Sequence, residues 1–192
     1  MMKVERFHIP GVVLVTPDLF RDERGFFLET FQKNRYEEAG IPGSFVQDNL
    51  SFSRRGVLRG LHYQWPNAQG KLVQCLRGEV LDVVADIRRG SPAFGRWMSF
   101  MLDGNDGKQL YIPEGCAHGF VVMSDEAYFI YKCTDFYAPA SERGLAWDDP
   151  KLAVDWRLGD ERPLLSGKDQ SLPTLETIAP EHLPLYEGSS QS

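Results

Sequence analysis

Short runs of β-forming residues, separated by turn-forming residues, recur along most of this 192-residue chain. Gly, Pro or Asp stands between many consecutive runs, as is typical of tight connections between strands. The expected strands are 12–15, 25–31, 45–52, 57–63, 72–76, 80–87, 97–102, 109–112, 119–123 and 127–133. A parallel sheet would need helices between its strands, and the pattern lacks them. The chain is therefore predicted to be all-β, as a sandwich or a barrel.

Only short helices are expected beside these strands. Residues 33–39 have a helical pattern that Gly40 and Pro42 end, and a second short helix is expected at 180–186. The chain contains no internal repeat, low-complexity block or linker. We therefore expect a single domain over residues 1–192, with a disordered tail at 187–192.

Charge and cysteine usage exclude several classes of protein. The net charge of −6 does not suit a nucleic-acid backbone, which needs a basic face. No apolar run approaches the roughly 20 residues that cross a bilayer, and residues 1–10 lack the apolar stretch of a signal peptide. Cys75, Cys116 and Cys133 are odd in number and widely spaced, so buried thiols are expected rather than disulfides or zinc ligands. These features predict a cytoplasmic protein that binds neither membranes nor nucleic acid.

Two segments have the spacing of the motifs of the cupin superfamily. The first begins at Gly56, reaches His62 after five residues, and ends at Gly78. The second begins at Gly107 and leads through residues 113 and 115 to His118. Because both segments occur in the right order within an all-β chain, we expect a cupin-type double-stranded β-helix, or jelly-roll barrel, with a few short peripheral helices.

The ligand positions of these motifs are only partly filled by metal-binding residues. His62 and His118 are present, but Gln64 stands where a metal-binding cupin has its second histidine. Lys71 stands near the position of the glutamate, after a longer gap, and its ammonium group would repel a cation. We therefore predict no catalytic metal, and a metal-dependent cupin, such as a dioxygenase or isomerase, is the disfavoured alternative.

A larger set of segments resembles the dTDP-4-dehydrorhamnose 3,5-epimerase family. These segments extend from near the start of the chain to about residue 175 and are specific only when taken together. They are DERGFFLETF (22–31), QDN (47–49), GVLRGLHYQ (56–64), KLVQCLRGEV (71–80), IRRGSPAFGRW (87–97), IPEGCAHGF (112–120), YKCTDFY (131–137), ERGLAWDDP (142–150) and LSGKD (165–169).

The resemblance implies inversion of C3 and C5 of a dTDP-linked 4-keto-6-deoxy-hexose, which gives dTDP-4-dehydro-L-rhamnose for dTDP-L-rhamnose biosynthesis. Both carbons adjoin the C4 ketone, so the reaction needs a base, a stabiliser for the enolate oxygen, and an acid on the opposite face. It needs no cofactor. The resemblance assigns these roles to His62 as base, Asp169 as its partner, Lys71 near the C4 oxygen and Tyr131 as the acid.

The same resemblance implies a set of residues that bind the substrate. Tyr137 is expected to stack on the thymine ring, and arginine suits the diphosphate because its planar fork donates paired hydrogen bonds. The full set is Arg24, Glu29, Gln47, Asp48, Asn49, Arg59, Lys71, His118, Tyr137, Glu142 and Lys168.

Simple strand alternation conflicts with one pair in this set. Arg59 and His62 are an odd number of residues apart, so a regular strand would point them to opposite faces. Both are expected to face the site. A bulge at Gly60 would reset the alternation, and we predict one there.

Two further alternatives remain from the sequence. A single-carbon epimerase, acting only at C3 or only at C5, would use the same catalytic residues. A sugar-nucleotide-binding module without catalysis is disfavoured, because competent side chains fill the positions of base, electrophile and acid. The resemblance also implies a homodimer, with the N-terminal strands at the interface.

Overall fold

The computed structural model describes residues 2–188, and antiparallel strands make up most of its regular structure. Its strands are β1 (Lys3–Arg6), β2 (Val13–Thr16), β3 (Leu19–Asp22), β4 (Gly25–Leu28), β5 (Gln47–Arg54), β6 (Leu58–Gln64), β7 (Lys71–Arg77), β8 (Glu79–Asp86), β9 (Trp97–Asp103), β10 (Gln109–Ile112), β11 (Cys116–Val122), β12 (Glu126–Cys133) and β13 (Glu142–Gly144). Its helices are α1 (Lys33–Glu38) and the 3₁₀ turns η1 (Pro139–Ser141), η2 (Asp169–Ser171) and η3 (Pro180–His182).

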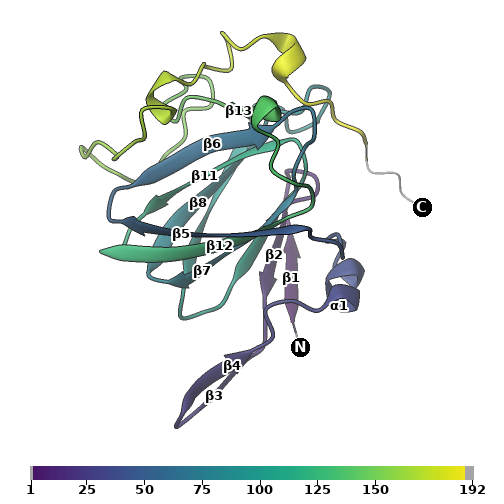
Figure 1. Ribbon diagram of the computed structural model, residues 1–192, viewed down its shortest axis with the longest axis vertical. Coiled ribbons are helices and arrows are strands. Elements are labelled where there is room, and N and C mark those ends of the chain that lie inside the picture. Colours follow the sequence, from purple (N-terminus) through teal and green to yellow (C-terminus); the bar gives the residue numbers. More distant parts are fainter. Residues whose placement is uncertain (1, 189–192) are drawn as a thin grey trace.

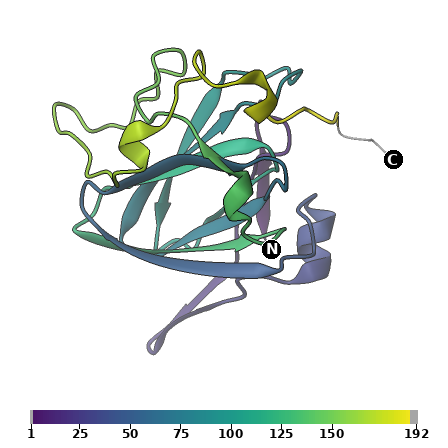
Figure 2. The ribbon, with the colours of Figure 1, turned by 45° about the horizontal axis from the view of Figure 1, so that its top comes forward.

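The described strands form two large sheets that enclose a common interior (Figures 1 and 2). One sheet has the order β1-β2-β10-β7-β12-β5, and the other has the order β13-β6-β11-β8-β9. The third sheet is the hairpin β3–β4, which projects away from the barrel (Figure 1). The segment that follows β13 lies over β6 and β11, so it closes one side of the barrel (Figure 1).

Strand β8 shows how the sequence produces this arrangement. Val80 and Val84 join the core inside the barrel. Leu81 and Val83 point the other way, into a second core under the C-terminal segment. Both faces of β8 are therefore buried, which explains the nearly continuous apolar sequence of this strand.

Helix α1 packs on the outer side of β2 and closes a third apolar cluster. Tyr36 is the buried residue of this helix, and its hydroxyl donates a hydrogen bond to Gln109 on β10. Gly40 follows in the left-handed region with φ of +77°, which ends the helix. The helix predicted at 33–39 is therefore confirmed to within one residue.

Several predicted boundaries were wrong. The strand expected at 25–31 ends at Leu28, because the carbonyl of Thr30 accepts side-chain hydrogen bonds from Tyr36 and Gln109 instead of joining a sheet. Only a single turn, η3, forms within the helix expected at 180–186. The tail expected to be disordered lies outside the described residues from position 189 onward. No helix within residues 2–188 combines the length and the apolar character that a membrane crossing requires.

Candidate active site

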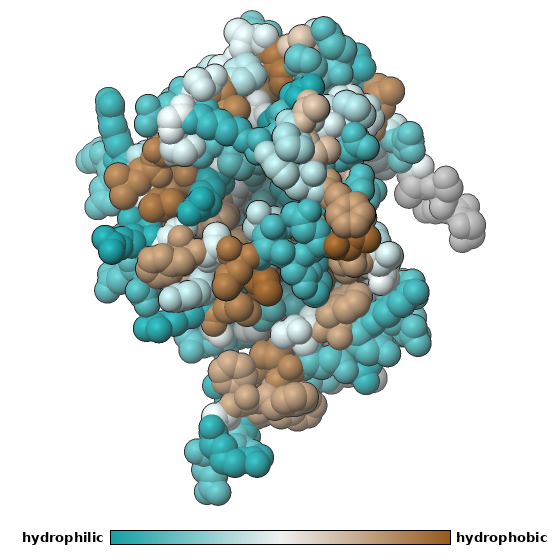
Figure 3. Space-filling view, viewed as in Figure 1, coloured by the Kyte–Doolittle hydropathy of each residue, from teal (hydrophilic) through white to brown (hydrophobic). Residues whose placement is uncertain are grey.

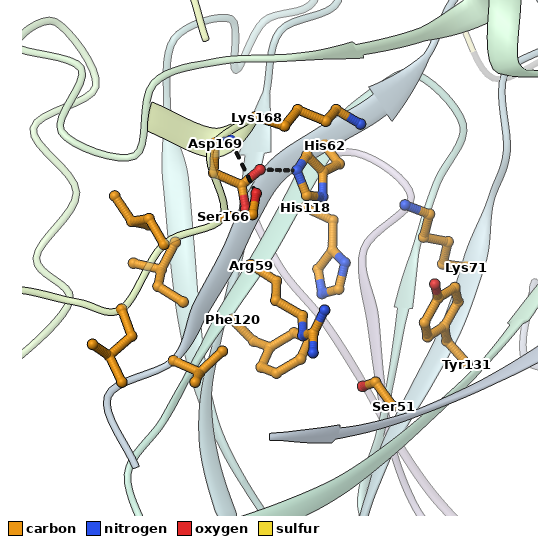
Figure 4. A pocket seen from close by; sticks show the side chains of 14 residues that line it. Ser51, Arg59, His62, Lys71, His118, Phe120, Tyr131, Ser166, Lys168 and Asp169 are labelled. Carbon is orange, nitrogen blue, oxygen red and sulfur yellow. Dashed lines mark hydrogen bonds and ion pairs between the residues drawn. The ribbon is translucent and has the colours of Figure 1, made fainter. Parts of the chain in front are cut away.

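A cavity of about 450 Å³ opens between the two sheets, beneath the C-terminal segment (Figure 4). A smaller hollow of about 210 Å³ adjoins it. His62, Lys71 and Tyr131 line both spaces, so these three side chains lie where the two meet. Three residues expected at the catalytic centre thus face one shared volume, although they come from three different strands.

A bulge in β6 directs Arg59 and His62 to the same side. His118 on β11 pairs with His62, and Phe120 pairs with Arg59, so three steps along β6 match two along β11. Gly60 provides the extra residue, with φ of +141°. A β-carbon added to Gly60 would lie 2.5 Å from the Cα of Gly119. The bulge predicted at Gly60 is confirmed, and both Arg59 and His62 line the cavity.

His62 and Asp169 form a hydrogen-bonded pair at the edge of the cavity. The Nε2 atom of His62 lies 2.6 Å from Oδ1 of Asp169, whose own N–H donates to Ser166 Oγ. Burial acts to raise the pKa of Asp169, but side-chain hydrogen bonds to its carboxylate from His62 and Ser166 and the charges of His62 and Lys168 hold the pKa below its ordinary value. An ionised carboxylate only accepts, so Nε2 carries the proton and Nδ1 of a neutral His62 is free to act as a base.

Lys71 and Tyr131 reach the cavity from the neighbouring strands β7 and β12 (Figure 4). Lys71 Nζ lies 5.9 Å from the centre of the Tyr131 ring. Burial lowers the pKa of Lys71, while the charges of Cys133, Asp82 and Glu142 act to raise it. Burial is also the main cause that raises the pKa of Tyr131, so its hydroxyl keeps its proton at neutral pH.

A second histidine–carboxylate pair lies deeper in the barrel. His118 Nε2 is 2.8 Å from Oδ2 of Asp82, and the ring of His118 stacks on Phe129. Asp82 is fully buried, and its Oδ1 has no hydrogen-bond partner among the described residues. Burial raises the pKa of Asp82, and the charges of His118 and Lys71 oppose that rise. No motif in the sequence pointed to Asp82, although it alternates with the inward-facing Val80 and Val84.

A chain of polar side chains stands at the mouth of the smaller hollow. The Tyr137 hydroxyl donates to Glu142 Oε2 at 2.9 Å, and the other oxygen of Glu142 is paired with Lys168. Gln47 accepts a hydrogen bond from the backbone N–H of Tyr137 and donates one to Asn49. Four of these residues, all expected to bind substrate, line the smaller hollow, and Lys168 lines the larger cavity beside it.

Three residues expected to bind substrate lie elsewhere within this single chain. Arg24, on the projecting hairpin, pairs with its neighbour Asp22. Glu29 pairs with Arg35 of α1, and Asp48 pairs with Lys132 on the outer face of the sheet. None of the three lines either hollow.

The positions that carry metal ligands in metal-binding cupins are arranged differently here. His62 and His118 each pair with an aspartate, position 71 is a lysine, and the Gln64 amide bonds to backbone groups of residues 67, 136 and 138. Within residues 2–188, no three His, Cys, Asp or Glu side chains gather as a metal ion would require.

Comparison with known families decides the relationship. The family model for dTDP-4-dehydrorhamnose 3,5-epimerase matches residues 6–177. This chain belongs to that family. It is 56% identical over 170 residues to the dTDP-4-dehydrorhamnose 3,5-epimerase of Pseudomonas aeruginosa, covering 88% of this chain and 93% of that one. The enzyme of the same name from Shigella flexneri is 52% identical over 170 residues, with the same coverage.

Solved structures of relatives have the same fold. The RmlC epimerase from Legionella pneumophila, in complex with dTDP-4-keto-L-rhamnose, superposes with a TM-score of 0.94 at 50% identity, covering 98% of this chain and 100% of that one. ChmJ from Streptomyces bikiniensis, a 3'-monoepimerase in complex with dTDP-quinovose, superposes with a TM-score of 0.88 at 38% identity, covering 94% and 92%. The family, the cupin-type all-β fold and the isomerase class expected from the sequence are thus confirmed for this epimerase-family chain.

Proposed function

We propose that this protein inverts C3 and C5 of dTDP-4-dehydro-6-deoxy-D-glucose and so makes dTDP-4-dehydro-L-rhamnose, a step of dTDP-L-rhamnose biosynthesis. The observation that carries the proposal is the shared cavity in which the His62–Asp169 pair faces Lys71 and Tyr131 (Figure 4). The family's named activity and the dTDP-sugar ligands of its solved relatives support it.

In this mechanism, Nδ1 of His62 removes the proton from the carbon next to the C4 ketone. The electron pair of the broken C–H bond becomes the enolate, whose oxygen is stabilised by the Lys71 ammonium group. Asp169 stabilises the imidazolium that forms. The Tyr131 hydroxyl then donates a proton to the opposite face of the same carbon, and exchange with water restores both side chains. The same sequence of steps at the second carbon completes the reaction.

The nucleotide is held beside this centre. Arg59 lines the larger hollow, and Ser53 Oγ accepts its Nε–H, which fixes the guanidinium for the diphosphate. Lys168 adds a second cation, and Tyr137 provides the aromatic face for thymine. Gln47, Asn49, His118 and Glu142 supply further polar contacts to the sugar and the nucleotide.

Proton exchange tests this proposal directly. We expect the wild-type protein to introduce deuterium at C3 and C5 of dTDP-4-keto-6-deoxyglucose in D₂O, as followed by NMR. His62→Ala should abolish this exchange without unfolding the protein, and His8→Ala, at an exposed position far along the chain from the site motifs, should leave it unchanged. Full exchange in His62→Ala would remove that histidine from its role.

The same measurement separates the runner-up function. ChmJ, a relative named as a 3'-monoepimerase, has the same fold as this chain, so a single-carbon epimerase is the second candidate. Exchange at both carbons supports the double inversion. Exchange at C3 alone or C5 alone would replace it with the narrower activity.

We also propose that the protein acts as a homodimer of single-domain chains. Apolar side chains gather on the hairpin β3–β4 and on the adjoining outer sheet face (Figure 3). Phe20 is 62% exposed and Phe27 is 70% exposed on the hairpin, and Leu50 and Phe52 are exposed on β5. Exposed apolar surface of this kind marks an interface. A partner placed there would receive Arg24 on the projecting hairpin.

Light scattering tests the dimer. The wild-type protein should have twice the mass of one chain, and Phe27→Asp should shift it toward the monomer, whereas Phe94→Asp, at an exposed position outside the hairpin, should not. A wild-type monomer would refute the proposal.

The three free cysteines, all buried, fit a reducing compartment, and we propose that the reaction takes place in the cytoplasm.

A further inference from the structure

Gln64 occupies the cupin position of a metal-ligating histidine, yet its side chain holds a segment of backbone. It is only 5% exposed. Its Oε1 accepts a hydrogen bond from the N–H of Ala138 at 2.8 Å. Its Nε2 donates to the carbonyl of Phe136 at 3.2 Å and to that of Asn67 at 2.8 Å. The amide is therefore hydrogen-bonded to the backbone on both sides of Tyr137.

These hydrogen bonds provide partners for backbone groups that have none in a sheet. Residues 136–138 follow the end of β12 and have no regular secondary structure. Peptide groups in such a segment need partners from side chains or water, and a buried amide supplies them with fixed geometry. From the opposite side, Gln47 accepts the N–H of Tyr137 at 2.8 Å. Two glutamines on neighbouring walls of the barrel thus fix the backbone that carries one tyrosine.

The ring of Tyr137 is 51% exposed at the mouth of the smaller hollow, and Glu142 holds its hydroxyl. An exposed ring has few packing contacts to orient it, so its direction depends on the backbone beneath. A primary amide offers an acceptor and two donors in one plane. One donor and the acceptor therefore match the carbonyl of Phe136 and the N–H of Ala138, which flank Tyr137. A neutral imidazole offers only one donor and one acceptor.

We propose that Gln64 is a positioning residue for recognition of the nucleotide base, acting through Tyr137. This inference rests on the proposed function, because it takes the Tyr137 ring as the platform on which thymine stacks. It assigns a role to the residue at a position that a metal-binding cupin fills with a ligand. In this chain, the side chain at that position holds the base platform in place.

The test compares two ligands that differ in the base. Titration calorimetry measures the binding of dTDP and of pyrophosphate to the wild type, Gln64→Met and Gln64→Glu. Gln64→Met removes every bond of the amide, and Gln64→Glu keeps the shape and the acceptor but loses both donated bonds. We expect Gln64→Met to weaken dTDP about tenfold, on the scale of one base–aromatic stack. Pyrophosphate binding and kcat should stay within about twofold, because neither uses the Tyr137 ring.

Gln74→Met is the matched control. Gln74 is also 5% exposed, and its amide donates to the carbonyl of Gly107 and accepts from Gln109, away from both hollows. It should leave binding of both ligands unchanged. Thermal melting checks that each variant is folded. If Gln64→Met does not fold, the affinities of Gln64→Glu are compared with the wild type instead.

A double-mutant cycle with Tyr137→Ala adds a second criterion. In that background, Gln64→Met should cause no further loss of dTDP affinity, because the platform is already absent. An equal loss with and without Tyr137 would overturn the proposal, as would a folded Gln64 variant with wild-type affinity for dTDP or an equal loss for pyrophosphate. A wild-type protein that does not bind dTDP at all would instead refute the proposed function.

Discussion

The Nε2 atom of His62 lies 2.6 Å from Oδ1 of Asp169, although 107 positions separate the two residues in the chain. Strand β6 carries the histidine, and the turn η2 of the C-terminal segment packs against that strand and carries the aspartate. The carboxylate is only 4% exposed, so water screens its interaction with the imidazole weakly. Because Asp169 takes Nε2, this contact leaves Nδ1 as the ring nitrogen for the proposed proton removal.

Asp169→Asn should therefore lower kcat by about 10³-fold while the fold persists. The amide keeps the shape but cannot stabilise the imidazolium, and comparable substitutions in hydrolases have effects of this size. Rates of deuterium exchange at C3 and C5 measure the loss. Asp160→Asn, at an exposed position, is the control. A variant that retains more than a tenth of the wild-type rate would show that His62 needs no such partner.

Tyr131→Phe should separate exchange from inversion. His62 still removes protons in this variant, so deuterium should enter the recovered substrate. Inverted product should form about 10²-fold more slowly, because no acid stands on the opposite face. NMR of substrate and product in D₂O follows both processes. Tyr128→Phe, on the outward face of the same strand, should behave like the wild type, and equal losses of exchange and inversion in Tyr131→Phe would contradict the assigned role.

Asp82→Asn should move the alkaline limb of the pH–rate profile to lower pH. In the proposed mechanism Lys71 acts as an ammonium group, so activity should fall as the pH rises through its pKa. Burial already lowers that pKa, and Cys133, Asp82 and Glu142 are the groups whose charges act to raise it. Removing the negative charge of Asp82 lowers the pKa of Lys71 further, so the fall begins earlier.

A kcat profile from pH 6 to pH 10 checks this shift. Asp125→Asn, an exposed carboxylate paired with Arg55, should leave the profile in place. An unchanged alkaline limb in Asp82→Asn would show that Asp82 does not sustain the charge of Lys71.

Gly60→Ala should destabilise the protein by about 3 kcal/mol and reduce activity. Its φ of +141° suits only glycine, and the new β-carbon would meet the Cα of Gly119 at 2.5 Å. Gly25→Ala separates the two causes, since Gly25 has a similar φ of +128° but nothing lies within 4 Å of an added β-carbon. We expect that control to cost about 1 kcal/mol in urea unfolding. Equal costs at the two positions would refute the steric argument.

The motif spacing located the part of the site that lies on regular strands. His62 and Lys71 fall at cupin ligand positions, and the conflict between Arg59 and His62 was enough to predict the bulge at Gly60. Asp82 was missed, because an aspartate in an apolar strand gives no functional signal in the sequence. Its role becomes visible only when the neighbouring strand places His118 beside it. Gln64 was seen only as a lost metal ligand, since its partners lie in an irregular segment of another part of the chain.

The predicted strand boundaries were wrong where pairing with a neighbouring strand, rather than the local sequence, determines that a segment is a strand. Strand β13 has the sequence ERG and no alternation, and it is a strand only because β6 lies beside it. Hairpin β3–β4 keeps its register although its phenylalanines are exposed, so hydrophobic burial within one chain does not explain its position. The distance of Arg24 and Glu29 from the cavity follows from the same outward direction of this part of the chain.

The position of Asp169 in the chain has a consequence for the synthesis of the protein. A ribosome makes every strand of both sheets, together with His62, Lys71 and Tyr131, before it adds the C-terminal segment that carries Asp169 and Lys168. A nascent chain that has already closed its barrel still lacks the carboxylate that pairs with His62. The proposed catalytic centre is therefore completed only after the barrel, once the segment that carries Asp169 has been made.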